Sequence, residues 1–334
     1  MTDRKKLRFR TLNRQKKSKI RFYLSEGLQY LVPRSHYRNQ KDTLLTEYQT
    51  NYTQEEKEDI QSRVNYYNKL SSPCRLGPDA HTLSQLSPDK HSVYFFDLYR
   101  VLRYFNSDQY FHHLFGDVIE IPQVPSFVKS RPIHGDNANS VVLKLDSVRH
   151  FDFIDDPIPF RDKKDLVVWR GSATMSHRKQ MLEAISQHPL CDIGCTNPMG
   201  PEFKPEWKKA PMPLSQQLEY KYILSIEGND VATNLKWIMS SNALCFMKAP
   251  VYETWFMEST LIPGKHYVLL RSDYSDLDEK IEFYKDHPDE AEKIIRNAHQ
   301  YLLDFKDKRK EQLVSLLVAK KYFDMVTADW QVMD

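Results

Sequence analysis

The spacing of apolar positions changes about a third of the way along the chain. In the first part, apolar residues recur every three or four positions, which is the period of an α-helix with one buried face. Thr53 and Glu56 also have the spacing of a capping box, which closes the start of a helix. We therefore expect a helix over residues 41–70 and a second amphipathic helix near residues 94–105. The positions that carry the pattern are Ile60, Val64, Tyr67, Tyr94, Leu98, Val101, Leu102 and Phe105.

From about residue 117, short β-rich runs alternate with helical patterns. This alternation predicts an α/β protein with a parallel sheet, which binds ligands beyond the carboxyl ends of its strands. We expect two α/β halves with a cleft between them, a boundary near residues 157–164, and closing helices over 289–303 and 308–323. The expected strands are 118–121, 140–145, 165–169, 191–193, 222–227, 243–247 and 266–271, and the expected helices between them are 176–187, 232–241 and 275–286.

Composition narrows the class of protein. The chain has 334 residues, of which 40% are apolar and 28% charged, as in globular proteins with a substantial core. The longest apolar run, residues 243–247, is too short to span a bilayer. Four cysteines do not suggest a disulfide framework, and the basic N-terminus lacks the apolar stretch of a secretory signal. These features predict a cytoplasmic protein.

Positive charge is concentrated at the start of the chain. Residues 1–21 hold ten basic residues and one acid, so this basic arm carries +9, whereas the remaining residues carry −6. Such an arm binds nucleic acid or an anionic membrane surface, unless it is a solvated, partly disordered segment. Interleaved apolar residues favour the membrane surface. The basic residues are Arg4, Lys5, Lys6, Arg8, Arg10, Arg14, Lys16, Lys17, Lys19 and Arg21, and the apolar ones are Leu7, Phe9, Leu12, Ile20, Phe22 and Leu24.

The first candidate for chemistry follows the expected strand 165–169. Arg170, Gly171 and Ser172 are expected to turn into a helix. There glycine lets a ligand approach the backbone, serine offers a hydroxyl, and the amides of the helix start favour anions. Arg170 and Arg178 are able to clamp phosphate oxygens through two N–H groups each. The alternative is a structural strand–turn–helix whose arginines form salt bridges.

A second strand–loop–helix pattern covers residues 220–237. An acid at the strand end is suited to bind ribose hydroxyls, the polar loop suits a diphosphate, and the first turns of the helix favour negative charge. The alternative is a helix cap rich in Asn and Asp. The candidate residues are Glu227, Gly228, Asn229, Asp230, Asn234 and Lys236.

A third candidate lies at residues 117–132. The expected strand 118–121 presents Glu120 before Pro122, where a carboxylate can act as a general base, and Lys129 and Arg131 follow. An acid before a proline turn is also a common structural feature.

Other signatures are weak or missing. The sequence has no dinucleotide fingerprint, P-loop, nucleophile elbow or kinase motif set. Its metal-ligand spacings are poor, so we predict no metal site. The pairs considered are Cys191 with Cys195, His112 with His113, and Asp155 with Asp156.

Over about residues 115–303, these stretches in this order resemble glycosyltransferase family 90. The resemblance implies a GT-B architecture, in which two Rossmann-like domains face each other across a cleft, and an inverting, metal-independent transfer from a nucleotide sugar. We expect a basic N-terminal arm over 1–40, an acceptor-side domain over 41–160, a donor domain over 161–303 and a C-terminal helix over 304–334. The matching stretches include IPQVPSFVKSRPI, PFRDKKDLVVWRGS, EYKYILSIEGNDVATNLKW and LIPGKHYVLL.

The resemblance also implies roles for single residues. Glu120 matches the position of the family's catalytic Asp, which makes it the expected base, with Lys129 and Arg131 on the acceptor side. Glu227 and Asn234 stand where the protein glucosyltransferases carry Arg, and this difference favours the bacterial lipopolysaccharide-core branch of the LpsA type. The residues that match the family's donor motifs are Arg170, Gly171, Ser172, Arg178, Glu227, Gly228 and Lys236.

We therefore expect an enzyme that moves glucose or galactose from a UDP-sugar to a sugar hydroxyl of the lipopolysaccharide inner core, with lipid A-core oligosaccharide as acceptor and no cofactor. We expect it on the inner face of the bacterial inner membrane, bound to the anionic surface through residues 4–21. One alternative is a transferase of the same fold with a capsule polysaccharide or protein acceptor. Another is a nucleic-acid-binding protein led by the basic arm, which the net charge of −6 on the remaining residues disfavours.

Overall fold

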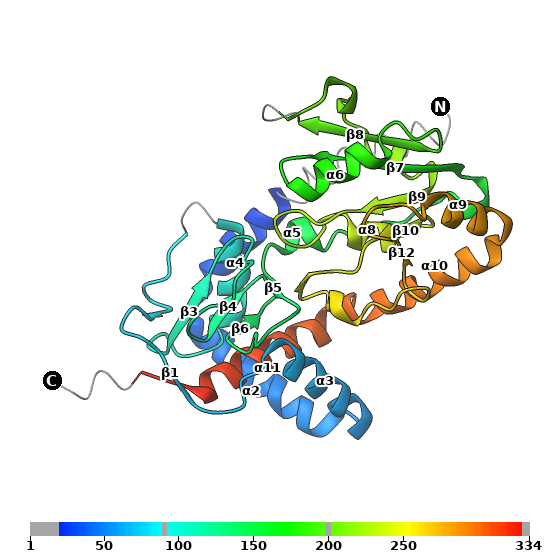
Figure 1. The fold of residues 1–334 in the computed structure, drawn as a ribbon. Coiled ribbons are helices and arrows are strands. Elements are labelled where there is room, and N and C mark those ends of the chain that lie inside the picture. Colours follow the sequence, from blue (N-terminus) through cyan, green and yellow to red (C-terminus); the bar gives the residue numbers. More distant parts are fainter. Residues whose placement is uncertain (1–19, 89–91, 198–201, 329–334) are drawn as a thin grey trace. The chain divides into compact units, whose positions relative to one another are not determined.

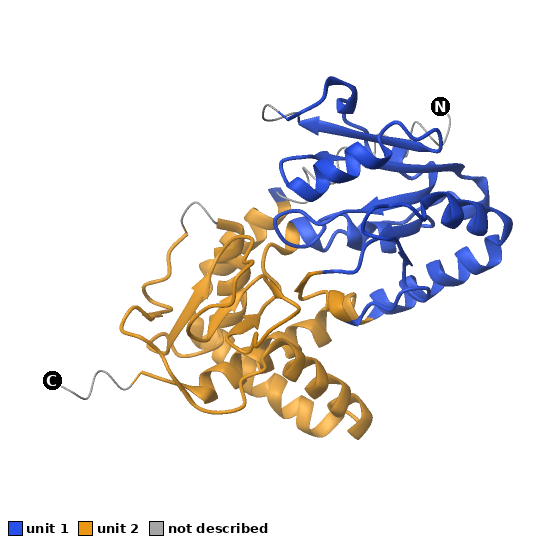
Figure 2. Cartoon of the chain, in the orientation of Figure 1, with its two compact units in different colours: residues 1–20, 149–250, 260–303 blue, residues 21–148, 251–259, 304–334 orange. Residues whose placement is uncertain are grey.

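The computed structural model describes residues 20–88, 92–197 and 202–328, and the chain divides into two compact units (Figure 2). Unit 1 comprises residues 1–20, 149–250 and 260–303, and unit 2 comprises residues 21–148, 251–259 and 304–334. Most of the basic arm, residues 1–19, lies outside the described residues. The acceptor and donor roles expected for the two halves stay predictions.

Unit 1 contains a parallel five-stranded sheet with the strand order β12-β10-β9-β7-β8 (Figure 1). Every residue of β9 and β10 is buried, as is typical of parallel strands covered on both faces. The sheet confirms the predicted α/β class. Its strands are β7 (Lys164–Ser172), β8 (Cys191–Asn197), β9 (Tyr220–Ser225), β10 (Leu244–Met247) and β12 (Val268–Leu269).

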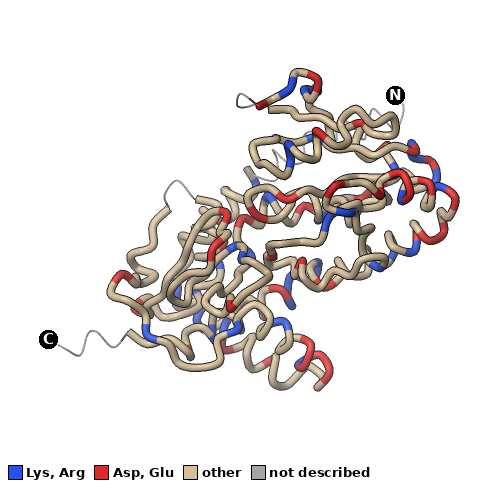
Figure 3. Tube along the Cα trace, viewed as in Figure 1, with Lys and Arg blue, Asp and Glu red and all other residues tan. Residues whose placement is uncertain are grey.

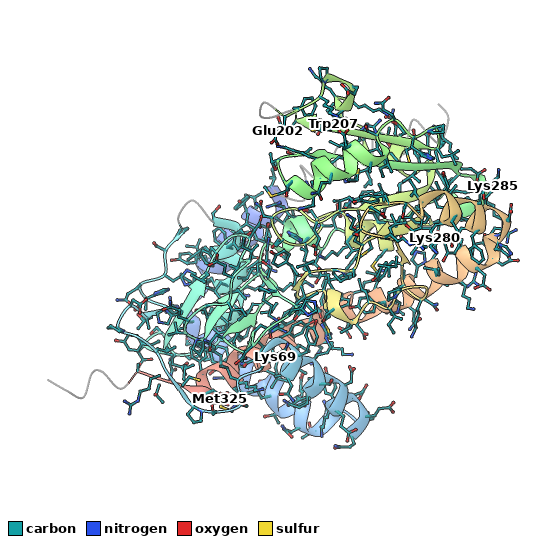
Figure 4. The ribbon with its side chains drawn as sticks, in the orientation of Figure 1. Lys69, Glu202, Trp207, Lys280, Lys285 and Met325 are labelled. Atoms are coloured by element: carbon teal, nitrogen blue, oxygen red, sulfur yellow. The ribbon has the colours of Figure 1, made fainter. Side chains whose placement is uncertain are left out.

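Helices connect these strands and share one apolar core with them. Met181 of α6, Ile281 of α9 and Ile294 of α10 are buried in the same cluster as Trp169 of β7. Trp207, labelled in Figure 4, joins this cluster next to the bridge between Cys195 and Lys208. The helices are α6 (Ser176–Ile185), α7 (Leu214–Gln217), α8 (Leu235–Met239), α9 (Leu277–Asp286) and α10 (Pro288–Leu302), with short 3-10 turns at η1 (Phe160–Asp162) and η2 (Pro205–Trp207).

Unit 2 has a smaller mixed sheet of order β2-β3-β4-β6, in which β2 alone is antiparallel to its neighbour. Two further strand pairs, β5–β11 and β1–β13, join segments far apart in the sequence. The strands are β1 (Cys74–Arg75), β2 (His81–Thr82), β3 (Tyr110–Leu114), β4 (Ser126–Val128), β5 (Ser130–Pro132), β6 (Ser140–Val142), β11 (Tyr252–Thr254) and β13 (Val326–Thr327).

The α-helix α11 packs against α2, α3 and α4 of unit 2. Residues 20–30 are also helical. The α-helices are α2 (Arg34–Asn51), α3 (Gln54–Tyr67), α4 (Ser92–Leu102) and α11 (Lys308–Met325), and further short helical segments of the described residues are α5 (Ser147–His150), η3 (Glu258–Thr260) and η4 (Leu303–Phe305).

Two helices replace the single helix expected over residues 41–70. The chain leaves the helical conformation at Tyr52 and Thr53, and Thr53 caps α3. Its side chain accepts a hydrogen bond from the Glu56 N–H while Glu56 accepts one from the Thr53 N–H, so the predicted capping box is confirmed. The box starts a new helix and therefore interrupts the one before it. The helix expected near residues 94–105 is confirmed as α4.

No helix in the described part of the chain is long and apolar enough to cross a bilayer. In the trace of each unit, Lys and Arg positions are interspersed with Asp and Glu positions (Figure 3). The described body thus lacks the dense positive charge of the basic arm.

A buried carboxylate joins the helices of unit 2. Glu311 of α11 accepts hydrogen bonds from Arg63 of α3 at 2.6 Å, from Lys144 at 2.7 Å and from the Trp255 indole N–H at 2.7 Å. Arg63 and Glu311 are almost fully buried. Removing one member of such a network leaves the other charge in a site of low polarity.

We expect Glu311→Gln to lower the free energy of unfolding by about 3 kcal/mol, because Arg63 loses its counter-charge while it stays buried. Chemical denaturation measures the change. Asp324→Asn is a matched control on the same helix, since its ion pair with Lys320 is solvent-exposed, and its effect should stay within about 0.5 kcal/mol. Equal effects of the two substitutions would contradict this assignment of Glu311.

Candidate functional site

The strand order of unit 1 defines a topological switch point. From β7 the chain proceeds to β8 at one side, and it then returns to β9, which pairs with the other side of β7. Connections that diverge in this way leave a crevice at the carboxyl ends of the two central strands, where parallel sheets bind their ligands. Both predicted donor motifs follow these strands, with Ser172 at the end of β7 and Glu227 shortly after β9.

Arg178 joins the ends of both strands. Its guanidinium donates hydrogen bonds to the backbone carbonyls of Glu227 at 2.8 Å, Ser172 at 2.9 Å and Ile226 at 2.9 Å. No carboxylate of the described residues forms an ion pair with it, and burial lowers the pKa of Arg178 from its usual value. The switch point therefore holds a partly buried positive charge that backbone carbonyls and the Trp169 ring, 5.7 Å from the guanidinium carbon, stabilise without a carboxylate of the described residues, which favours an anionic ligand.

Two further features of α6 face the same loop. The His177 ring Nε2 lies 2.8 Å from the Glu227 carbonyl oxygen. Met175, the N-cap residue of α6, makes no capping hydrogen bond through its side chain, and its carbonyl accepts from the Arg178 and Lys179 amides. His177 is not among the candidate residues that the sequence predicts. Its position beside Arg178, in the first turn after β7, is the signal that identifies it.

The turn expected at residues 170–172 is a continuation of β7, which corrects the sequence-based prediction. β7 extends through Ser172, with an irregular register between Gly171 and Ser172 where it pairs with β8. Gly171 has no room for a side chain, because a Cβ there would lie 2.5 Å from the ring of buried Trp169. The glycine thus lets the strand continue over the indole.

Arg170 differs from Arg178 in having a carboxylate partner. Its guanidinium forms an ion pair with Asp192 of β8 at 2.7 Å and also donates to the Asp192 carbonyl. Burial would raise the pKa of Asp192, but hydrogen bonds from Tyr220, Lys209 and Arg170 outweigh it and lower the pKa to about 2. The charge of Arg170 is therefore compensated, which favours the structural alternative at this position.

The second motif forms a compact loop before α8. The Gly228 N–H donates to the Asp230 carbonyl at 3.0 Å, and a Cβ on Gly228 would lie 3.4 Å from the Arg178 guanidinium. Asn234 donates a hydrogen bond to the Leu224 carbonyl at 2.9 Å and so connects α8 to β9.

The side chains of the second motif differ in their exposure to solvent. Asn229 is exposed, Glu227 is half-buried, and Asp230 and Lys236 are buried. Their donor-binding roles stay predictions.

Glu120 lies in unit 2, in an irregular segment, and the strand expected over 118–121 is wrong. Pro122 and Pro125 lack the N–H groups that a ladder needs, and Val118 instead exchanges backbone hydrogen bonds with the Ser130 hydroxyl. The Glu120 side chain is exposed and forms no hydrogen bond or ion pair within the described part of the chain. Its carboxylate is accessible, as a general base must be, and its role as the base stays a prediction.

The two residues expected on the acceptor side are buried. Lys129 forms an ion pair with Asp117. Arg131 is fully buried, forms an ion pair with Glu253 of β11 at 2.7 Å and donates to the Ser140 carbonyl at 3.0 Å. These contacts favour a structural role for Arg131 over contact with an acceptor sugar.

Among the described residues, no group of three or more His, Cys, Asp or Glu side chains is arranged to hold a metal ion. Of the pairs considered from the sequence, Asp156 forms a buried ion pair with Lys163 at 2.7 Å, and His112 lies 3.6 Å from Asp79. Metal independence of the reaction stays a prediction.

The topological switch point and Arg178, which has no carboxylate partner among the described residues, are typical of an α/β domain that binds an anionic ligand, and comparison with known proteins identifies the class of this protein. The family model of glycosyl transferase family 90 matches residues 147–322. The chain is 51% identical over 267 residues to O-glucosyltransferase LpsA of Dichelobacter nodosus, an alignment that covers 80% of this chain and 83% of the relative. It is 27% identical over 177 residues to human protein O-glucosyltransferase 3, which covers 52% of this chain and 34% of the relative.

The chain belongs to glycosyltransferase family 90, and it is an LpsA-type glycosyltransferase. The matched region includes the whole of β7, β9 and the two loops at the switch point, whereas Glu120, Lys129 and Arg131 precede it.

We expect Gly171→Ala to destabilise the protein by about 1–3 kcal/mol, because the new Cβ would overlap the buried Trp169 ring and force the end of β7 to shift. Thermal and chemical unfolding measure the change. Gly27→Ala is the control, since a Cβ on Gly27 meets no atom within 4 Å. A Gly171→Ala variant as stable as the Gly27→Ala variant would show that Trp169 repacks at no cost.

Proposed function

We propose that this enzyme transfers glucose from UDP-glucose to a sugar hydroxyl of the lipopolysaccharide inner core, with inversion at the anomeric carbon. We further propose that units 1 and 2 are the donor and acceptor domains of a GT-B architecture. The observation that carries the proposal is Arg178 at the switch point: its partly buried charge is bound by three carbonyl groups and paired with no carboxylate of the described residues. A diphosphate supplies the missing negative charge.

Glucose is favoured over galactose by the relatives. The bacterial relative is called an O-glucosyltransferase, and the human one a protein O-glucosyltransferase. The lipopolysaccharide acceptor is favoured over a protein acceptor by the length of the similarity, which covers 83% of the bacterial relative but 34% of the human one. A capsule polysaccharide remains the nearest alternative acceptor.

In the proposed reaction, the Glu120 carboxylate takes the proton from the acceptor hydroxyl as its oxygen attacks the anomeric carbon of the donor. The new C–O bond forms on the face opposite the diphosphate, the bond between the sugar and the diphosphate breaks, and UDP leaves with the bonding electrons. Arg178 and the first amides of α6 stabilise the charge that develops on the leaving diphosphate. Lys236 is fully buried, so it stabilises the leaving diphosphate through the electric field of its charge and not through direct contact.

The basic arm places the enzyme near its acceptor. Lipid A-core oligosaccharide is anchored in a bilayer, and each Lys or Arg close to an anionic bilayer contributes about 1 kcal/mol to binding. We propose that residues 4–21 hold the protein on the inner face of the inner membrane, where cytoplasmic UDP-glucose and the growing core are both accessible.

We expect UDP and UDP-glucose to raise the melting temperature of the protein, because a ligand at about one hundred times its Kd adds about 2.7 kcal/mol to native stability. The rise should survive EDTA, should be absent with GDP-mannose, and should be strongly reduced in Arg178→Met. Lys179→Met is the matched control on the same helix, since Lys179 pairs with exposed Glu202. If no nucleotide changes the melting temperature of the unsubstituted protein, the donor site is assigned incorrectly.

Glu120→Gln should lower the turnover of glucose transfer to a lipid A-core oligosaccharide by roughly 10²- to 10⁴-fold, because the amide cannot accept the proton of the acceptor hydroxyl. The UDP-induced rise in melting temperature should remain unchanged. Glu55→Gln, at an exposed glutamate of unit 2, is the control and should retain full turnover. A Glu120→Gln variant with turnover equal to this control removes Glu120 from the role of base.

A further inference from the structure

The helical residues 20–30 have one face packed on α4. Glu26 forms an ion pair with Arg100 at 2.5 Å, and Gln29 accepts a hydrogen bond from Arg103 at 2.8 Å. The Phe22 ring packs edge-on against Phe96 with centroids 6.4 Å apart. These contacts fix the rotation of the helix about its axis, so its other face points away from α4.

That other face is apolar and exposed. Leu24, Leu28 and Leu31 are 65%, 69% and 77% exposed, and Ile20, one turn before Leu24, is 62% exposed. Their spacing of four residues places Ile20, Leu24 and Leu28 on one face of the helix, and Leu31 follows in the turn that begins directly after it. Single exposed leucines are ordinary, but a contiguous stripe on a helix whose opposite face packs on α4 marks an interaction surface. We call Ile20, Leu24, Leu28 and Leu31 the leucine stripe.

The charge next to the stripe indicates its partner. The stripe follows directly on the basic arm, whose ten Lys and Arg residues give residues 1–21 a net charge of +9. A second copy of this chain would bring two such arms together, and their like charges repel. An anionic bilayer attracts the arm and also offers an apolar layer just below its headgroups.

We propose that the leucine stripe inserts into the apolar boundary of an anionic bilayer, with helix 20–30 parallel to the surface and the basic arm bound to the headgroups. The tertiary structure excludes Phe22 from this contact, although the sequence pattern groups it with Leu24, because Phe22 is buried against α4. The inference extends the proposed membrane association to a second, apolar element, and it holds whichever sugar and acceptor the enzyme uses.

The test uses the full chain and sedimentation with vesicles of phosphatidylglycerol and phosphatidylethanolamine. Leu24→Ser/Leu28→Ser should reduce the partition coefficient roughly tenfold or more, and the loss should persist at about 0.5 M salt, where binding of the arm is screened. Ile262→Ser/Leu303→Ser is the matched control, since these side chains are 49% and 50% exposed elsewhere, and it should bind like the unsubstituted protein. Thermal unfolding verifies that both variants are folded.

Equal binding of the stripe variant and the control variant would overturn the proposal. So would a stripe variant that changes from dimer to monomer by light scattering without losing vesicle binding, because a second copy would then cover the stripe. The UDP-induced rise in melting temperature tests the proposed donor binding independently of membrane binding, since it is measured without vesicles. A folded stripe variant that retains this rise but no longer binds vesicles supports the leucine stripe as a membrane contact.

Discussion

Three hydrogen bonds from Arg178 hold together the two loops on which the candidate site of unit 1 depends. The acceptors are backbone carbonyls at the ends of β7 and β9, so a single side chain fixes the separation of two motifs that lie about 50 residues apart. The second loop passes close to the guanidinium, since a Cβ on Gly228 would lie 3.4 Å from it. A cation fixed before the ligand arrives needs no reorganisation when negative charge develops on a leaving group.

The pairing of buried cations separates structural residues from candidate functional ones. Arg63, Arg131 and Lys163 each contact a buried carboxylate, and such pairs mainly maintain the fold. Within the donor motifs the same distinction applies, since Arg170 is paired with Asp192 while Arg178 donates its hydrogen bonds to carbonyl groups and forms no ion pair with a described carboxylate. A partly buried charge without a carboxylate partner costs stability in the free protein, and a site that recovers this cost on binding an anion is expected to be functional.

Local signals in the sequence were sufficient for much of the fold. Apolar runs predicted the five parallel strands of unit 1 to within a few residues, and the Thr53–Glu56 box predicted the start of α3. The short strands β4, β5 and β11 of unit 2 were missed, because three residues each carry no recognisable period and are extended only through pairing with other segments. The strand predicted over residues 118–121 was wrong for the opposite reason. Its residue types favour a strand, but the segment pairs with no described strand, and the prolines that follow lack the N–H groups that pairing needs.

The sequence by itself determined the order of helices and strands in unit 1, the family motifs and the charge of the basic arm, since each of these features depends on residues that are close together in the sequence. Only the tertiary structure decided which arginine of the donor motifs is neutralised by a carboxylate, and which apolar face of helix 20–30 is left exposed. Asp192 pairs with Arg170 from the neighbouring strand β8, and Phe22 packs against α4 while Leu24 stays exposed. Both outcomes depend on contacts between residues far apart in the chain, which periodicity and spacing do not encode.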